Sequence, residues 1–136
     1  MDKSYAQIAE ALQSYFDGFY ECDVAKLKQI FHDRCHLFSA TDGPLSDDDM
    51  EAVYKRVASR TPGAKTGEAR LDRILSIDMS GPEAALVKLQ IAIGPKLFTD
   101  YLSLLKLDGR WKIISKTYTY VPREQAAVRP AAQAAE

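Results

Sequence analysis

The sequence predicts an α+β fold in which N-terminal helices pack on a strongly curved, mostly antiparallel sheet. Three observations predict it. Apolar side chains near the N-terminus recur at helical spacing. The second half of the chain contains long strand patterns separated by short turn sequences. The segment 97–120 holds two of these patterns joined by Asp108-Gly109, a two-residue hairpin signal. Such a sheet is expected to wrap around the helices and leave a cavity between the layers.

The first 31 residues predict a pair of antiparallel helices. Residues 4–21 form the first helix, because apolar side chains three and four residues apart share one of its faces. Asp23 is expected to cap a second, short helix. The buried side chains of the pair are Ile8, Leu12, Tyr15, Phe16, Phe19, Val24, Leu27, Ile30 and Phe31.

A short strand and a third helix are expected next. Residues 35–40 are typical of a strand, and the loop 41–44 follows it. Ser46 is expected to cap the third helix, with the carboxylates of residues 47–49 in its first turn, where they complement the helix dipole. Its apolar face consists of Met50, Val53, Tyr54 and Val57.

The rest of the chain predicts a meander of four strands after a polar loop at 60–68. Short turns at 80–82, 94–95 and 108–109 separate the strands. We expect one domain over residues 1–121 and a flexible, Ala-rich tail over 122–136. The expected strands are 71–78, 84–93, 97–107 and 111–121.

Composition narrows the classes of partner. The chain has 136 residues, 46% of them hydrophobic, which is enough for one substantial core. Its net charge of −1 gives no reason to expect nucleic acid or an anionic membrane as a partner. No apolar run approaches the ~18–20 residues of a membrane span, and residues 1–13 lack the apolar core of a signal peptide. We therefore expect a cytoplasmic protein, in which Cys22 and Cys35 are free thiols.

The segments YFDGFYECDVAKLKQIFHDRCHLFSATDG and FTDYLSLLKLDGRWKIISKTY carry a family resemblance. In their order and layout, across residues 5–121, they resemble the nuclear transport factor 2-like (SnoaL-like) superfamily. The second segment is most similar to its "putative lumazine-binding" subfamily. The resemblance implies a cone-shaped fold with an internal pocket. The superfamily includes isomerases, dehydratases, polyketide cyclases and non-catalytic modules, so the fold alone does not define a function.

Comparison with the ketosteroid-isomerase branch tests one mechanism. That mechanism needs a tyrosine, a general-base carboxylate and a second, protonated carboxylic acid. Ungapped counting places the tyrosine on Tyr15 but the two acids on Ser39 and Ser103. Asp42 or Asp100 would replace them only after an odd shift in register, which turns a strand side chain to the opposite face. The resemblance therefore argues against isomerase activity by this mechanism.

The same alignment implies which strand faces line the cavity. Even-numbered side chains of the strand 84–93 face inward and its apolar odd-numbered ones outward. On the last strand, Lys116, Tyr118 and Tyr120 face inward, and Ile113 faces outward. An apolar outer face needs a cover, so we expect a homodimer through the sheet face, as is the family habit.

The expected site is a small-molecule pocket inside the cone. Two lysines among tyrosines favour a polar or anionic ring ligand. The alternative is that the lysine stems run along the wall and their ammonium groups reach solvent at the mouth. The expected ligand-binding residues are Tyr15, Phe19, Tyr54, Lys88, Gln90, Tyr101, Ser103, Lys116 and Tyr118. No cofactor is expected, and no metal, because His32 and His36 lack a third ligand nearby.

Three functions remain open. The favoured one is a small-molecule binding protein. The first alternative is an enzyme of the polyketide cyclase, dehydratase or isomerase type, with Tyr15 and either Lys116 or Tyr118 as its acid and base. It supposes that a neighbouring ammonium group favours the tyrosine phenolate. The second alternative is a protein-interaction module, as in the transport factor itself.

Overall fold

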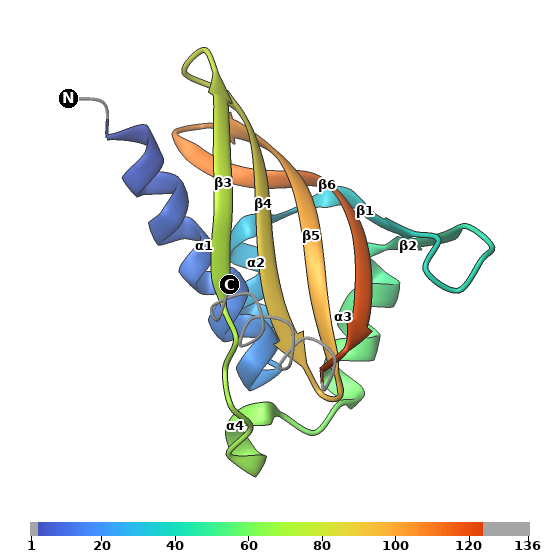
Figure 1. Cartoon of the computed structure of the whole chain (residues 1–136). Coiled ribbons are helices and arrows are strands. Elements are labelled where there is room, and N and C mark those ends of the chain that lie inside the picture. The colour runs from blue at the N-terminus through green and yellow to red at the C-terminus, as the bar shows by residue number, and fades with distance from the viewer. Residues whose placement is uncertain (1–2, 124–136) are drawn as a thin grey trace, which may run out of the picture.

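The computed structural model describes residues 3–123, so the expected tail lies almost entirely outside the described residues. Two helices come first in the chain, as predicted, and the sheet has six strands, one more than predicted. Figure 1 shows the long strands side by side, with the three longer helices behind the sheet. The elements are α1 (Ser4–Glu21), α2 (Val24–Ile30), β1 (Phe31–Ser39), β2 (Ser46–Asp49), α3 (Met50–Ser59), α4 (Gly63–Thr66), β3 (Arg73–Ser80), β4 (Ala84–Ile93), β5 (Lys96–Leu107) and β6 (Arg110–Pro122).

The sheet has the strand order β2-β1-β6-β5-β4-β3. Only β1 and β6 pair in parallel, and all the other neighbours are antiparallel. The hairpin between β5 and β6 turns at Asp108 and Gly109, whose φ angles are 51° and 78°. These left-handed values suit Asp and Gly. The predicted α+β class and hairpin are confirmed.

The two N-terminal helices also form as predicted. Ile8, Leu12 and Tyr15 on α1 are fully buried. The Asp23 side chain caps α2 by accepting a hydrogen bond from the Lys26 backbone N–H at 3.2 Å. Gly18 allows α2 to approach closely, because a Cβ there would lie 2.6 Å from the Leu27 side chain. The helix pair therefore presents one continuous apolar face to the sheet.

The start of the third helix differs from the prediction. Residues 46–49 form strand β2, which pairs with the end of β1, and α3 begins only at Met50. Asp49 caps this helix by accepting a hydrogen bond from the Ala52 backbone N–H at 2.9 Å. Asp and Ser are equally good caps, so local chemistry did not decide between Ser46 and Asp49. Pairing with β1 decided it.

The predicted inward face of β4 is wrong. Val87, Leu89 and Ile91 are buried against the helices, whereas Lys88 and Gln90 lie on the outer face. The apolar stripes of the helices need apolar cover, and the odd-numbered side chains of β4 supply it. The ungapped alignment therefore placed this strand one residue out of register.

The same error affects β5, and β6 contains a bulge. On β5 the even-numbered side chains face inward, Asp100 among them. On β6 the pairing slips by one residue between Ile113 and Ser115. Ile113 and Lys116 are therefore both buried, although they are three positions apart and would face opposite sides of a regular strand. The predicted inward position of Lys116 is confirmed, and the predicted outward position of Ile113 is wrong.

The outer sheet face is partly apolar. Its exposed hydrophobic side chains lie among polar ones, such as Gln90, whose amide donates to the Thr99 hydroxyl at 3.3 Å. They are Leu75, Leu86, Tyr101, Leu105 and Leu107. Among the described residues, no helix is both long and apolar enough to cross a membrane.

Candidate functional site

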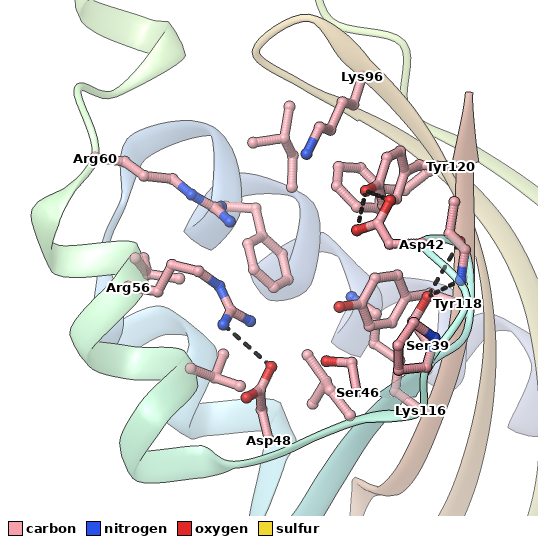
Figure 2. Close-up of a pocket in the computed structure, with 18 residues that line it drawn as sticks. Ser39, Asp42, Ser46, Asp48, Arg56, Arg60, Lys96, Lys116, Tyr118 and Tyr120 are labelled. Carbon is pink, nitrogen blue, oxygen red and sulfur yellow. Dashed lines mark hydrogen bonds and ion pairs between the residues drawn. The ribbon is translucent and has the colours of Figure 1, made fainter. Parts of the chain in front are cut away.

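A cavity of about 260 Å³ opens between the helices and the curved end of the sheet. Figure 2 shows side chains from α3, from β1, β2 and their connecting loop, and from β5 and β6 directed into it. Its polar lining consists of Ser39, Thr41, Asp42, Ser46, Asp48, Arg56, Arg60, Lys96, Lys116, Tyr118 and Tyr120.

A second cavity of about 450 Å³ adjoins the first. It extends toward α4 and the β4–β5 turn, where its lining includes Tyr20, Glu68 and Pro95. The two cavities together form a pocket in two lobes. The residues common to both linings are Phe19, Arg60, Ile93, Lys96 and Phe98.

Behind the wall of the first cavity lies a buried cluster of Tyr15, Asp100 and Lys116. The Tyr15 hydroxyl donates to Asp100 Oδ2 and accepts from Lys116 Nζ, the latter at 2.7 Å. Lys116 Nζ also pairs with Asp100 Oδ2 at 3.2 Å. Of the three residues only Lys116 lines the cavity. A lysine at the cavity wall is therefore held in place by two groups that are themselves fully buried.

The pKa shifts in this cluster follow from its burial. Burial raises the pKa of Tyr15 well above its ordinary value, and the negative charge of Asp100 adds to the shift. Burial lowers the pKa of Lys116, although Asp100 opposes this. The sequence-based idea that Tyr15 loses its proton readily is therefore wrong. Tyr15 acts here as a hydrogen-bond donor to Asp100.

Aromatic rings surround the ammonium group of Lys116. Lys116 Nζ lies 5.0 Å from the centroid of Phe19 and 5.2 Å from those of Tyr15 and Tyr118. Phe98 packs against Tyr118 at a centroid distance of 5.8 Å. The cavity thus combines the Lys116 ammonium group with several ring surfaces, an arrangement suited to a flat polar molecule.

Ion pairs and hydrogen bonds connect polar side chains of the cavity lining. Arg56 Nη1 pairs with Asp48 Oδ2 at 3.1 Å. The Tyr120 hydroxyl lies 2.9 Å from both carboxylate oxygens of Asp42. Lys96 Nζ stands over the Tyr120 ring, 4.3 Å from its centroid. These contacts fix the polar side chains in place before any ligand arrives.

The structure brings together only part of the expected site. Phe19, Lys116 and Tyr118 line the first cavity, and Tyr15 lies directly behind it. Tyr54 instead lines a shallow depression between α2 and α3, where Lys28 Nζ is 5.4 Å from its ring. The expected residues on the outer sheet face, away from both cavities, are Lys88, Gln90, Tyr101 and Ser103.

Sequence reasoning missed several polar residues of the pocket, and it wrongly set Asp100 aside on strand register, although this buried carboxylate accepts from the Tyr15 hydroxyl. Asp100 had a visible signal, because it is the one charged side chain among the apolar even-numbered residues at 98–104 of β5. Arg56 and Arg60 had a weaker one, since they recur on the α3 stripe of Val53 and Val57. Asp42 had been weighed as a replacement acid and set aside, and Asp48 had been expected in a helix start, whereas it lies on β2 and lines the cavity. Lys96, the first residue of β5, had no signal.

Neither histidine joins the pocket lining. His36 Nδ1 lies 2.7 Å from Asp47 Oδ1, and His32 Nδ1 accepts from the Arg34 backbone N–H. Both histidines belong to β1. Among residues 3–123, no three His, Cys, Asp or Glu side chains are placed to hold a metal ion. Burial raises the pKa of the Cys35 thiol to about 12, so it stays protonated at neutral pH.

Comparison with known proteins identifies the family. Residues 3–119 match the family model described as "Putative lumazine-binding". The chain belongs to this family. Aldolase FrzH from Cladobotryum sp is a relative with 25% identity over 121 residues, covering 88% of this chain and 93% of FrzH.

Solved structures confirm the nuclear transport factor 2-like fold of this family member. An NTF2-like protein from Shewanella baltica OS155 superposes with a TM-score of 0.79 at 24% identity, covering 88% of this chain and 95% of that one. An NTF2-like protein from Methylobacillus flagellatus KT superposes with a TM-score of 0.77 at 23% identity, covering 89% of this chain and 94% of that one. An NTF2-like protein from Silicibacter pomeroyi DSS-3 superposes with a TM-score of 0.75 at 20% identity, covering 89% of this chain and 100% of that one. At these identities the likeness concerns the fold alone.

Proposed function

We propose that this protein binds a small, flat, polar organic molecule in the two-lobed pocket. The observation that carries the proposal is the position of Lys116. Its ammonium group lies at the wall of an aromatic cavity, and Tyr15 and Asp100 hold it there. A side chain so fixed loses little conformational freedom when a ligand binds, which favours affinity. The family description, "Putative lumazine-binding", names one flat molecule of this kind.

The pocket is also of the right chemical type. Small-molecule sites are usually apolar clefts with a few polar groups at fixed positions. Here Phe19, Phe98 and Tyr118 supply ring surface, while Lys116 and the hydroxyl of Ser39 supply polar contacts. A ring system with carbonyl oxygens can stack on the aromatic side chains and accept a hydrogen bond from the ammonium group.

Binding of lumazine, followed by its fluorescence, tests the proposal, together with native mass spectrometry of the purified protein. We expect saturable binding or a co-purifying small molecule. The double variant Lys116→Met/Asp100→Leu removes the charge and its partner together, and it should weaken binding roughly tenfold or more. Tyr118→Ala removes ring surface while leaving Tyr15, Asp100 and Lys116 unsubstituted, and it serves as a second variant.

Lys112→Met is the matched control. Lys112 lies on the same strand but outside both cavities, where its Nζ donates to the Gln29 carbonyl at 2.7 Å. It should bind lumazine as wild type does. The proposal is overturned if the wild type carries no co-purifying molecule and binds no lumazine, or if binding is the same in all variants.

A second candidate is an enzyme that makes or breaks a carbon–carbon bond next to a carbonyl group. Two observations favour it, the Lys116 ammonium at the cavity wall and the relative named Aldolase FrzH. In an aldol addition, a base removes a proton from the carbon beside one carbonyl, and the resulting enolate carbon attacks a second carbonyl carbon. The new alkoxide then takes up a proton. Lys116 can stabilise the enolate oxygen, and the carboxylates of Asp42 and Asp48 are candidate bases.

A fluorogenic β-hydroxyketone, which releases a fluorescent aldehyde on retro-aldol cleavage, distinguishes this enzyme from a pure binding protein. We expect the enzyme to cleave it and the Lys116→Met/Asp100→Leu variant to be inactive. Binding of lumazine without any cleavage leaves the binding function as the conclusion. The raised pKa of Tyr15 argues against this tyrosine as the catalytic base of such an enzyme.

The outer sheet face supports the proposed homodimer only in part. Its exposed side chains include Leu86 and Leu105 but also Lys88 and Gln90, so it is less apolar than the sequence led us to expect. We propose that a second copy of the chain covers this mixed face. A cytoplasmic location also stays a prediction.

A further inference from the structure

The junction of the two cavities holds an arginine without an acidic partner. Arg60 lines both cavities, and its side chain points into the first one (Figure 2). Its Nη1 atom is buried and has no hydrogen-bond partner among the described residues. A buried guanidinium nitrogen without a partner is costly, because it has lost its water and gained nothing in return.

The nearby acids are already engaged. Asp100 pairs with Lys116, and Asp48 pairs with Arg56. Asp42 accepts the Tyr120 hydroxyl with both of its oxygens. Glu68, which lines the second cavity with Arg60, pairs with Arg123 Nη2 at 3.4 Å and accepts from the Gly94 backbone N–H at 3.3 Å. In the part of the chain that the structure describes, each acid that lines the two cavities is therefore engaged with a group other than Arg60.

The backbone fixes the position of this arginine. Arg60 is the C-terminal cap of α3, and its N–H donates to the Val57 carbonyl at 3.2 Å. The negative end of the helix dipole favours a cation there. Arg56 lies one turn earlier, and burial and the Arg56 charge lower the pKa of Arg60. A bound anion would relieve both the burial cost and the repulsion between the two arginines.

We propose that Arg60 binds the carboxylate of an organic monoanion, whose ring contacts Phe19 and Phe98 at the junction of the two cavities. This inference rests on the proposed binding function and names the class of ligand. A guanidinium group matches a carboxylate with two parallel hydrogen bonds. One negative charge is favoured over two, because Asp42 and Asp48 face the same cavity and repel further negative charge.

A matched pair of probes tests the inference. 2-Naphthoate carries the carboxylate, and 2-naphthamide has the same ring and nearly the same shape without the charge. Equilibrium dialysis should show that the wild type binds 2-naphthoate roughly tenfold or more tightly than the amide. In Arg60→Gln this preference should disappear, while affinity for the amide stays within about twofold. Arg60→Lys should retain part of the preference, because lysine keeps the positive charge but lacks the paired N–H donors of the guanidinium group.

Lys65→Gln is the control for net charge. It removes one positive charge from an exposed side chain on α4 outside both cavities, and should keep the wild-type preference. The inference is overturned if the wild type binds both probes equally, or if Arg60→Gln keeps the preference for the carboxylate. Either result leaves the proposed function intact as long as lumazine or a co-purifying molecule still binds. If no small molecule binds at all, both proposals fall.

Discussion

Removing the Lys116 ammonium group should be among the most costly single changes in the pocket. Asp100 is completely buried, and within residues 3–123 the polar partners of its Oδ2 atom are Lys116 and the Tyr15 hydroxyl. Its Oδ1 atom has no hydrogen-bond partner among the described residues. Lys116→Met therefore leaves a buried carboxylate with a single donor. Breaking a buried ion pair in this way costs about 3–5 kcal/mol of unfolding free energy.

Comparing the unfolding free energies of single and double variants tests whether Lys116 stabilises the fold by pairing with Asp100. Lys116→Met/Asp100→Leu removes both charges, and replacing a buried pair by apolar side chains is often neutral or stabilising. The double variant should therefore unfold within about 1 kcal/mol of wild type. Tyr15→Phe removes one donor and should cost about 1–3 kcal/mol. The free energy of unfolding of a domain of this size is about 5–15 kcal/mol, so all three variants should still fold.

Urea unfolding at neutral pH, followed by circular dichroism, provides the measurement. The slope of free energy against urea should stay constant, so that shifts in midpoint report stability alone. Lys112→Met is again the control and should differ little from wild type. The reasoning is refuted if Lys116→Met unfolds within about 1 kcal/mol of wild type, or if the double variant is as unstable as the single one.

Two further predictions concern tyrosine ionisation and assembly. The chain has seven tyrosines, and burial raises the pKa of Tyr54 to about 12 and that of Tyr15 well above its ordinary value. Because these folded-state pKa values exceed the unfolded value of about 10, the stability they contribute is complete below that pH and is lost as pH rises toward 12. Phenolate absorbance at about pH 11 should show both still protonated while the protein is folded, and full ionisation of all tyrosines in a folded sample would contradict this. For assembly, Leu86→Lys on the outer sheet face should convert the proposed homodimer to a monomer in sedimentation, because an unpaired charge in an apolar interface is unfavourable. Leu45→Lys, in the exposed β1–β2 loop, is the control, and an unchanged Leu86→Lys dimer would exclude this face as the interface.

Local sequence patterns determined most elements of this protein, with the exception of β2, which formed by pairing with β1. The spacing of Ile8, Leu12 and Tyr15 produced α1, Asp23 capped α2, and Asp108-Gly109 turned the last hairpin. Each of these signals acts between residues that lie close together in the sequence. The fold class followed, because helices that precede a long antiparallel sheet have few ways to pack.

The tertiary structure alone decided which strand faces line the pocket. A shift of one residue exchanges the two faces of a strand, and local sequence does not detect it. The bulge in β6 buries both Ile113 and Lys116, while the register of β5 brings Asp100 to the hydroxyl of Tyr15. Arg60 is likewise defined by what surrounds it, since only the packed pocket shows that every nearby carboxylate is already engaged. Contacts between distant segments set these positions, so the sequence by itself determined the framework and the packed structure determined the site.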